Sequence, residues 1–575
     1  MADETFLLAR ALVDGSASGA LLYSDVGLSF WGGVDAATGD VIDRHHPLAG
    51  QNIAGKILAI PSGRGSCTGS GVLLELILNG AAPAALLFEH VEEILTLGVL
   101  VAEEIFGKSI PVVALGSAAF QALKDVRFVK IQEGEVLCSP VPFAADAPAS
   151  FFAKEIAQTV ALEAADKAAL EGANGRAVQA SMRIILRMAE IQGATELLSV
   201  TRAHIDGCIY VGPSGILFAE KLRDWGGQVV IPTTLNAISV DALRWRAQGI
   251  APALGTASMQ LAEAYVAMGC EATYTCAPYL LEHPPAQGEQ IVWAESNAVV
   301  FANSVLGART VKYPDYLDIC IALTGRAPLS GVHIEANRLA AVVVRLPPLQ
   351  NVDDGFFALL GYHVGTLCPN QIPLVVGLEK FAVSQDDLKN FGAAFATTSA
   401  APMFHILGVT PEATHLDVPS IDVTAADLLR SWKELNSATD PHVDVICLGS
   451  PHLSFVEFEK LAALCEGRVK NSAVALIITS GRHIYQKAKA SGAVAALEKF
   501  GVQIVSDTCW CQIGEPLFPP HAKSLMTNSG KYAHYGPGLI GRPVYLGSMK
   551  DCVDVACTGL AKRDLPHWLG DLLQS

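Results

Sequence analysis

Charge is scarce in this 575-residue chain, and positive charge above all. Only 17% of the residues are charged, and 40 Lys and Arg stand against 57 Asp and Glu, which gives a formal net charge of -17. No cluster of Lys or Arg interrupts this acidic balance. Because proteins bind nucleic acids largely through the phosphates, this composition argues against a nucleic-acid partner.

A long uninterrupted apolar run is also missing. Hydrophobic residues make up 51% of the chain, but apolar stretches such as 76–88 are short and contain Asn79, Gly80 and Pro83. A helix that spans a membrane needs about 20 apolar residues. The first ten residues carry Asp3 and Glu4 and lack the basic flank and apolar core of a secretory signal. We therefore expect a cytoplasmic protein without a membrane partner.

The cysteines lack the spacing of a zinc site. None of the thirteen forms a C-x-x-C pair, which excludes a zinc ribbon, and an odd number without a secretory signal favours reduced thiols over a disulfide framework. Cys276, Cys447 and Cys509 each end an apolar, strand-like run and precede a loop. Thiolates from separate strand ends can bind an iron-sulfur cluster and leave one iron open to substrate. For any one of them, the alternative is a small apolar core residue.

An Ala- and Pro-rich segment divides the chain. Residues 138–150 read CSPVPFAADAPAS and have no periodic pattern, which predicts a linker at 141–155 between a small domain at 1–140 and a large region at 156–575. Short apolar runs at 55–60, 84–88 and 111–115 predict that the small domain is β-rich. In the large region strand and helix patterns alternate, which predicts an α/β fold.

The clearest alternation lies at 442–510. Apolar runs at 443–449, 473–479 and 502–506 are separated by helical patterns at 454–465 and 484–500, which predicts a βαβαβ unit. Ser454 and Glu457 have the spacing of a capping box. Helical crossovers imply parallel strands, whose carboxyl ends meet at one edge and usually build the ligand site.

A glycine-rich loop in the small domain could bind an anion. Gly63, Gly65 and Gly69 follow a predicted strand and precede a predicted helix. Backbone N-H groups at a helix start attract anions, and Arg64 could grip a carboxylate. Ser66 lies where this field would favour its alkoxide and make it a base. A turn-rich helix start, with Ser and Gly acting only as caps, explains the same residues equally well.

Polar side chains also gather at 201–207, 295–310 and 527–538. Buried amides and an Arg imply a bound polar partner, or else they satisfy one another across a domain contact. His45, His46 and His452 adjoin proline turns and are interpreted as structural. The predicted substrate-binding residues are Arg64, Gly65, His204, Ser296, Asn297, Arg309, Lys531 and His534.

Long motifs in a fixed order make the chain resemble the aconitase X family in its fused, bacterial form. The small domain carries HHPLAGQNIAGKIL and GRGSCTGSGVLLEL. The large region carries AHIDGCIYVG, IPTTLN, TCAPY, GEQIVWAESNAVVFANSVLGART, DICIALTGRAP and KYAHYGPG. The resemblance covers nearly the whole chain. It implies that one chain holds the swivelling small domain and the large component, with a monomer as one possible assembly.

The resemblance implies the fold and the chemistry of the aconitase superfamily. The large region is expected to form three-layer α/β/α domains that hold an iron-sulfur cluster, and the N-terminal swivelling domain is expected to close over a small substrate. Cys276, Cys447 and Cys509 are the expected metal ligands. Related chains carry a cysteine before the dipeptide PH, where this chain has Ser450, and Cys447 is the expected substitute.

The implied reaction is the elimination of water from a small hydroxy acid. Fused members dehydrate cis-3-hydroxy-L-proline to a pyrroline carboxylate, and archaeal two-chain members dehydrate mevalonate 5-phosphate, which is the alternative. In our hypothesis Ser66 removes the proton alpha to the carboxylate while Arg64 or Arg309 grips that carboxylate. A third reading, an iron sensor that binds RNA, conflicts with the acidic composition.

Overall fold

The computed structural model describes residues 5–44, 46–132, 134–143, 159–562 and 564–574. The chain divides into two compact units. The first comprises residues 1–233, 263–270 and 313–330, and the second comprises 234–262, 271–312 and 331–575. Most of the predicted linker at 141–155 lies outside the described residues.

An eight-stranded sheet forms the N-terminal part of the first unit, in the order β1-β8-β7-β3-β4-β5-β6-β2. Strands β3 to β6 are parallel, and antiparallel strands flank them on both sides. The predicted apolar runs form β4, β5 and β6, as the sequence indicates. The bounds are β1 (Thr5–Leu7), β2 (Arg10–Val13), β3 (Ala17–Tyr23), β4 (Ile57–Ile60), β5 (Ala85–Phe88), β6 (Val112–Ala114), β7 (Phe128–Gln132) and β8 (Glu135–Ser139).

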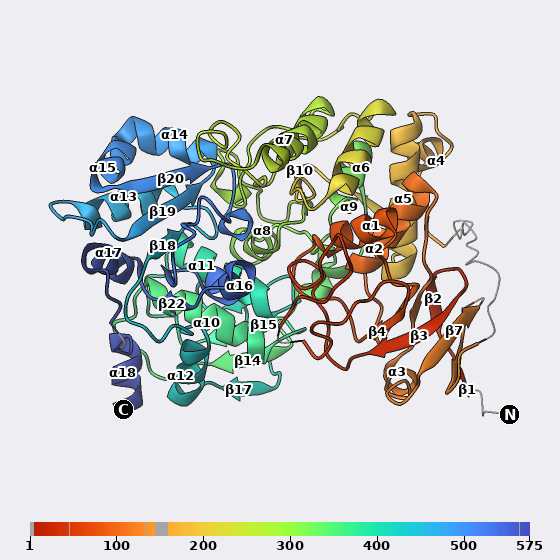
Figure 1. Ribbon diagram of the computed structural model, residues 1–575, viewed down its shortest axis with the longest axis horizontal. Coiled ribbons are helices and arrows are strands. Elements are labelled where there is room, and N and C mark those ends of the chain that lie inside the picture. The colour runs from red at the N-terminus through yellow and green to blue at the C-terminus, as the bar shows by residue number, and fades with distance from the viewer. Residues whose placement is uncertain (1–4, 45, 133, 144–158, 563, 575) are drawn as a thin grey trace. The chain divides into compact units, whose positions relative to one another are not determined.

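Helices cover this sheet because its central strands are apolar on both faces. All residues of β4 and β5 are buried. Alternate side chains such as Ile57 and Leu87 pack with Phe120 of α3 (Ser117–Gln121) in one core. Helices α1 (Gly69–Asn79) and α2 (Ile94–Phe106) pack together, and Figure 1 shows them on the side of the sheet opposite α3.

Helices dominate the remainder of the first unit. Helix α5 (Arg176–Gln192), which Gly193 caps at its C-terminus, contacts α2, α4 and α9. The other elements are α4 (Ala164–Leu170), β9 (Leu197–Ser199), β10 (Ala203–Ile205), α6 (Pro213–Asp224), α9 (Leu317–Thr324) and β13 (Arg326–Pro328). At the sequence junctions of the units lie β11 (Thr233–Leu235) and α7 (Pro252–Ala267).

A buried ion pair joins α5 to α2, and its loss is expected to destabilise the first unit. Arg187 Nη1 lies 2.6 Å from Glu103 Oε1, and their side chains are only 7% and 4% exposed. In Arg187→Met the Glu103 carboxylate would stay buried without its cation, so we expect a loss of about 3–5 kcal/mol. Arg183→Met is the matched control, because Arg183 is 36% exposed in its pair with Glu104 and should cost about 1 kcal/mol or less. Thermal unfolding of both variants measures the difference; equal midpoints would contradict the prediction.

Two parallel sheets organise the second unit. One has the order β16-β15-β14-β17, and the other has the order β20-β19-β18-β21-β22. The strands are β14 (Val342–Arg345), β15 (Pro373–Val376), β16 (His405–Ile406), β17 (Ser420–Asp422), β18 (Val445–Leu448), β19 (Ala475–Ser480), β20 (Val502–Ser506), β21 (Leu525–Thr527) and β22 (Val544–Leu546). A short β12 (Val292–Trp293) precedes α8.

The helices of this unit lie between and around these strands in sequence. They are α8 (Ser296–Phe301), α10 (Asp354–Leu367), α11 (Gln385–Thr398), α12 (Ala425–Glu434), α13 (Phe455–Cys465), α14 (Arg482–Ser491), α15 (Ala493–Phe500), α16 (Gly530–Ile540), α17 (Met549–Thr558) and α18 (His567–Gln574). Short helical turns are η1 (Pro278–Leu280), η2 (Ala302–Leu306), η3 (Gly331–His333), η4 (Glu335–Arg338) and η5 (Trp510–Gln512).

The five-stranded sheet confirms the predicted three-layer α/β/α fold. All its strand pairs are parallel. Alternate residues of one strand enter different cores: Cys447 packs in one, and Ile446 and Leu448 pack in the other. Figure 1 shows α13, α14 and α15 beside β18, β19 and β20.

The predicted βαβαβ unit is present with one difference. Ser454 caps α13, and Glu457 completes the capping box. The single helix predicted at 484–500 is two helices, α14 and α15, because Gly492 between them adopts a φ of +90°. Glycine adopts this left-handed conformation without the steric cost that a side chain brings.

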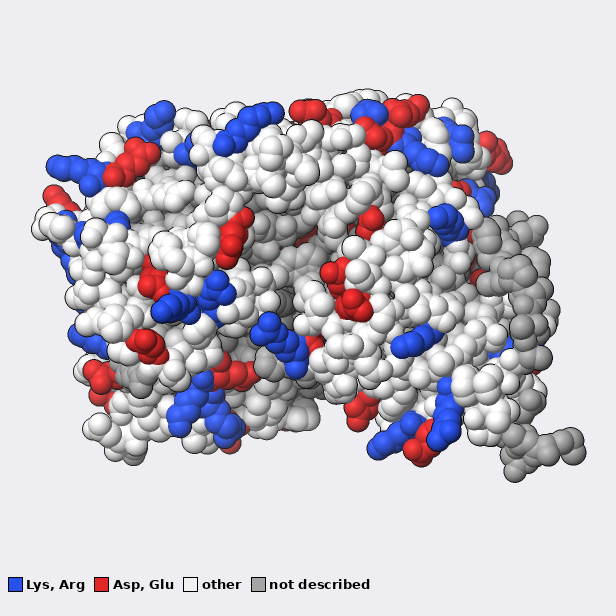
Figure 2. Space-filling model, viewed as in Figure 1, with Lys and Arg blue, Asp and Glu red and all other residues white. Residues whose placement is uncertain are grey.

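Two features bear on membrane and nucleic-acid binding among the described residues: the length of the apolar helices and the charge on the face drawn in Figure 2. Of the helices in the described ranges, none has the length and apolarity to cross a membrane. On the face drawn in Figure 2, Lys and Arg side chains alternate with Asp and Glu. This face therefore offers no continuous basic path to a phosphate backbone among the residues that the structure describes.

Candidate metal centre and active site

Three cysteines come together in the second unit. Cys276 and Cys509 are buried and pack with Ala237, and the half-buried Cys511 packs against them. Cys276 lies just before η1. Cys509 immediately precedes η5 and Cys511 lies within it, shortly after the end of β20. The carboxyl end of a parallel strand thus contributes two thiols, and a loop far away in sequence contributes the third.

The helical turn η5 determines the approach of Cys509 and Cys511. Trp510 is buried, its indole N-H donates to the Leu448 carbonyl at 2.8 Å, and its ring lies 5.2 Å from that of Tyr532. The Cys509 and Cys511 thiols share a side-chain hydrogen bond, which raises the pKa of Cys509 and lowers the pKa of Cys511. Cys511 is therefore the thiol of this group that ionises most readily.

A buried ion pair lies beside the cysteines. Lys531, at the start of α16, donates from Nζ to Glu295 Oε1 at 2.8 Å, and both side chains are less than 15% exposed. Burial opposes both charges, but their mutual attraction outweighs it, so the pKa of Lys531 is raised and the pKa of Glu295 is lowered. The site therefore keeps a fixed ammonium next to a fixed carboxylate.

Asn297 connects this ion pair to Cys276. Its Nδ2 donates to Glu295 Oε1 at 2.6 Å and to the Cys276 carbonyl at 2.9 Å. Its Oδ1 accepts from the Tyr279 hydroxyl at 2.8 Å. With three hydrogen bonds inside the protein, Asn297 holds the Glu295 side chain and the Cys276 backbone in one arrangement.

The structure places Cys447 and Ser450 outside the group of three thiols. Cys447 points from β18 into a hydrophobic core, where burial and the neighbouring Cys552 raise the pKa of its thiol far above the usual value. Ser450 is buried, and its carbonyl accepts a hydrogen bond from Ser529, the N-cap of α16. The predicted ligand set is thus divided: two members meet, and Cys447 lies in an apolar environment.

The chemistry of the three thiols fits an iron-sulfur cluster. Three sulfur donors suit an iron-sulfur cluster that keeps one iron open to substrate, and the lowered pKa of Cys511 favours the thiolate that binds iron. Within the described ranges, no three His, Cys, Asp or Glu side chains converge on a point that would hold a single metal ion. A cluster is larger than one ion, so its ligands need not converge in that way.

Ser66 belongs to the first unit and lies just before α1. Its Oγ donates to Thr68 Oγ1 at 3.1 Å and accepts from the Thr68 N-H at 3.2 Å. Gly65 before it has a φ of +83°, and a Cβ at Gly63 would lie 2.7 Å from Glu92 Oε1. Gly63 is therefore required by the close approach of Glu92, and Gly65 by its left-handed backbone; Ser66, which is half-buried, follows them just before the helix.

Arg64 already has a carboxylate partner in the same unit. Its Nη2 lies 2.9 Å from Asp43 Oδ2, and its side chain is 48% exposed. An exposed pair of this kind is weak. The guanidinium could therefore exchange Asp43 for a substrate carboxylate at little cost.

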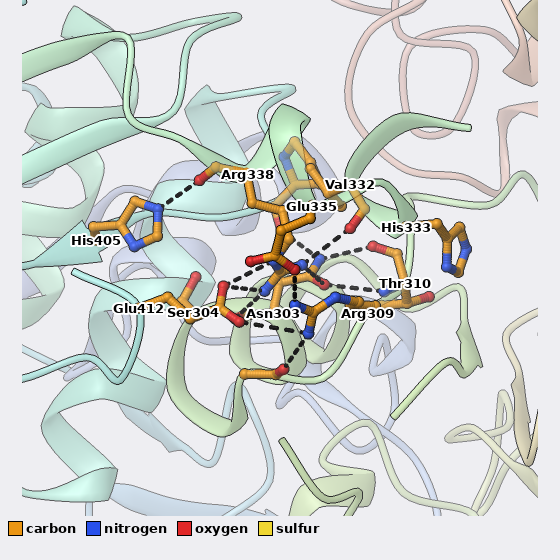
Figure 3. Close-up of polar contacts among 12 residues, drawn as sticks. Asn303, Ser304, Arg309, Thr310, Val332, His333, Glu335, Arg338, His405 and Glu412 are labelled. Atoms are coloured by element: carbon orange, nitrogen blue, oxygen red, sulfur yellow. Dashed lines mark hydrogen bonds and ion pairs between the residues drawn. The ribbon is translucent and has the colours of Figure 1, made fainter. Parts of the chain in front are cut away.

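Arg309 lies in a network of carboxylates, shown in Figure 3. It pairs with Glu335, and its Nη1 lies 3.5 Å from Glu412 Oε1. Glu412 also binds the buried Arg338 at 2.7 Å, which in turn donates to the Asn303 carbonyl at 3.0 Å. These contacts join the segments around η2, η4 and residue 412, and they favour a structural role for Arg309 over the predicted role in binding substrate.

The remaining candidates are dispersed. His204 is buried in β10 of the first unit. Ser296 is half-buried at the start of α8, where Glu295 is the N-cap. His534 is exposed on α16, and its Nδ1 lies 3.3 Å from the Tyr362 hydroxyl. Of the predicted residues in the second unit, Asn297 and Lys531 lie at the thiols.

Cys511, Glu295 and His452 are the residues that sequence reasoning did not select. Two cysteines two residues apart share a face of an extended segment, and this signal could have added Cys511 to Cys509. Glu295 begins the polar segment at 295–310, but its partner Lys531 is 236 residues away. His452 adjoins a proline, yet it contacts Cys276 directly: its backbone N-H donates to the Cys276 sulfur at 3.3 Å.

Comparison with known proteins finds one family along the whole chain. Four models match in order: the aconitase X swivel domain over residues 7–138, the first domain over 159–336, the second domain over 336–433 and the third domain over 443–558.

Curated relatives cover nearly the full length. A cis-3-hydroxy-L-proline dehydratase of Hypocrea jecorina is 54% identical over 98% of this chain and 97% of its own, and one of Pseudomonas aeruginosa is 52% identical over 98% and 99%. The large subunit of a phosphomevalonate dehydratase of Methanothermobacter thermautotrophicus is 34% identical over 64% of this chain and 91% of its own. A crystal structure of the holo-form of Thermococcus kodakaraensis aconitase X has a TM-score of 0.63 at 30% identity and covers 69% of this chain and 100% of the other.

Proposed function

Because the chain belongs to the aconitase X family, we propose that it is an iron-sulfur dehydratase that removes water from cis-3-hydroxy-L-proline. Relatives that carry this activity in their names match at 52–54% identity along the whole chain, whereas the phosphomevalonate dehydratase subunit is more distant. The observation that carries the proposal is the meeting of Cys276, Cys509 and Cys511 beside the Lys531–Glu295 pair.

In this proposal Cys276, Cys509 and Cys511 hold the cluster. When bound, the cluster supplies a Lewis acid that makes the substrate hydroxyl a better leaving group. Cys511 takes the place that the sequence assigned to Cys447, because its thiol contacts the Cys509 thiol and has a lowered pKa. The thiols enter from two loops that Trp510 and Asn297 hold in place.

Lys531 is the proposed partner of the substrate carboxylate. Its ammonium has three donors, and Glu295 accepts one of them. The remaining N-H groups can donate to a carboxylate and stabilise the negative charge that develops when the alpha proton leaves. Glu295 keeps the ammonium protonated and fixed, since the pair raises the pKa of Lys531 well above its usual value.

Ser66 is the proposed base. Its oxygen, as the alkoxide, would take the proton from C2 of the ring, the C2–H electrons would form the C2=C3 double bond, and the C3–O bond would break. The hydroxyl group would leave as water with a proton taken up from solvent, and Ser66 would release the C2 proton to solvent, which restores the base and makes the net loss one water. The resulting enamine tautomerises to the imine, a pyrroline carboxylate. The hydrogen bond from the Thr68 N-H to Ser66 Oγ supports this role, because it stabilises negative charge on that oxygen.

Anaerobic purification followed by substrate addition tests the proposal. We expect bound iron and inorganic sulfide with visible absorption, and conversion of cis-3-hydroxy-L-proline to the pyrroline carboxylate, detected by mass spectrometry. Mevalonate 5-phosphate is the second arm of the assay. Turnover of mevalonate 5-phosphate alone would replace the proposed substrate, and turnover of neither compound by an iron-loaded protein would overturn the proposal.

Lys531→Met is expected to lower kcat/KM by about 10²–10³ and to leave the iron content unchanged. The substitution keeps the length of the side chain but removes the ammonium that binds the carboxylate. Lys523→Met is the matched control, because Lys523 is exposed in the segment that precedes the same helix. Steady-state kinetics together with iron analysis measure the effect, and an unchanged kcat/KM would remove Lys531 from the mechanism.

A further inference from the structure

His452 connects the two segments that carry the cysteines. Its side chain is fully buried at the carboxyl end of β18. Nδ1 lies 3.2 Å from the Thr275 hydroxyl, next to Cys276, and Nε2 lies 2.8 Å from the Thr508 carbonyl, next to Cys509. The imidazole ring thus connects Thr275, which precedes Cys276, to Thr508, which precedes Cys509. These two segments are distant in the sequence.

The hydrogen bonds assign the tautomer of this ring. The Thr508 carbonyl can only accept, so Nε2 carries the proton and donates it. Nδ1 is then an acceptor, and the Thr275 hydroxyl donates to it, while the oxygen of that hydroxyl accepts from the Ala277 N-H at 3.1 Å. The His452 ring, the Thr275 hydroxyl and the Thr508 carbonyl all have hydrogen-bond partners in this one arrangement. A buried polar network is rigid when its members are satisfied in this way.

The backbone of His452 is fixed as well. Its N-H donates to the Cys276 sulfur at 3.3 Å, and its carbonyl accepts from Lys389 Nζ at 3.3 Å. Lys389 is 1% exposed and is held by Glu457 and by Asp386, the latter at 3.2 Å. A buried cation with two carboxylates therefore anchors the peptide that donates to the sulfur. Hydrogen bonds to cysteine sulfurs alter the electron density, and hence the reduction potential, of iron-sulfur clusters.

We infer that His452 is a positioning residue for the thiol site: its ring holds Cys276 and Cys509 in register with each other, and its backbone N-H sets the environment of the Cys276 sulfur. The inference deepens the proposed function and rests on it for the part that concerns the cluster. Groups that orient the ligands of a metal centre commonly contribute 10–100-fold to its affinity. The chemistry recognised is that of a thiolate-bound iron-sulfur cluster.

Two variants separate the parts of the bridge. His452→Leu fills a similar volume but removes both ring hydrogen bonds. His452→Gln keeps a donor that can reach the Thr508 carbonyl, so it should restore much of the effect. His442→Leu is the matched control, because His442 is 74% exposed and precedes the same strand.

The first measurement needs no cluster. Iodoacetamide alkylates Cys276 in the iron-free full chain, and peptide mass spectrometry follows the rate. This rate should rise about tenfold in His452→Leu. In His452→Gln it should stay within about threefold of the rate in the unmutated chain. An unchanged rate in His452→Leu overturns the inference. If that variant does not fold, His452→Asn replaces it. Asn cannot reach Thr508, so slower alkylation in His452→Gln than in His452→Asn supports the bridge, and equal rates overturn it.

The second measurement uses the loaded protein. After anaerobic reconstitution we expect His452→Leu to retain about tenfold less iron under chelator challenge than the unmutated chain, with a shifted midpoint potential in the fraction that remains. His452→Gln should keep the iron. Wild-type retention and potential in His452→Leu would contradict the inference. An unmutated chain that takes up no iron would refute the proposed function, and the alkylation rates would still decide the role of His452.

Discussion

Replacing Cys511 with alanine is expected to prevent assembly of the proposed iron-sulfur cluster and to lower dehydratase activity by at least about 10³. Two thiols would remain where three are needed, and the lost thiol is the one whose pKa is lowered by its neighbour Cys509. The Cys276→Ala variant should behave in the same way. Iron and sulfide analysis, visible circular dichroism and turnover of cis-3-hydroxy-L-proline measure the loss.

Cys447→Ala is the decisive control for this ligand set. Cys447 is fully buried in β18 and packs in a hydrophobic core, so its loss should lower the thermal midpoint and leave the iron per folded chain unchanged. Cys511 is half-buried, so its replacement should affect the fold less and the iron more. The opposite pattern, with iron lost from Cys447→Ala and retained in Cys511→Ala, would restore the ligand set expected from the sequence.

Ser66→Ala is expected to lower kcat by about 10²–10⁴ and to leave the cluster absorption and the fold intact, because a base that removes a proton in the transition state contributes roughly that much. Among the described residues, the hydroxyl has hydrogen bonds with its neighbour Thr68, so its removal should disturb little else. Single-turnover measurements with iron-loaded protein isolate the chemical step from product release.

Ser62→Ala provides the comparison for Ser66→Ala. Ser62 is a half-buried serine at the beginning of the same loop, and its replacement should leave kcat within about twofold of the unmutated value. Exchange of the C2 hydrogen of the substrate with deuterated water adds a direct readout, since it should also stop in Ser66→Ala. Full activity of Ser66→Ala would exclude that oxygen as the base.

Local sequence patterns predicted the helices and strands well where residues a few positions apart determine the structure. The capping box of Ser454 and Glu457 and the apolar run of β18 depend on neighbours a few residues apart, and both are present. The break at Gly492 was missed, because a glycine inside a helical pattern does not reveal its φ.

The site was harder to predict, because its contacts are distant in sequence. The pairing of Lys531 with Glu295 and that of Arg309 with Glu412 depend on how loops meet after folding. Nothing in the pattern around Arg309 distinguishes a substrate ligand from a structural ion pair. Cys447 ends an apolar run as Cys509 does, but the alternation of side chains along β18 points it into the core.

The position of η5 late in the chain has a consequence for biosynthesis. Lys531 and Glu295 are 236 residues apart, and Cys276 precedes Cys509 by a similar interval. Ribosomes make the N-terminal part first, so a nascent chain that ends before Cys509 offers one of the three sulfurs and lacks the ammonium. If these thiols hold the proposed cluster, iron delivery would follow translation of nearly the whole polypeptide, and prematurely terminated products would not sequester the metal at this place.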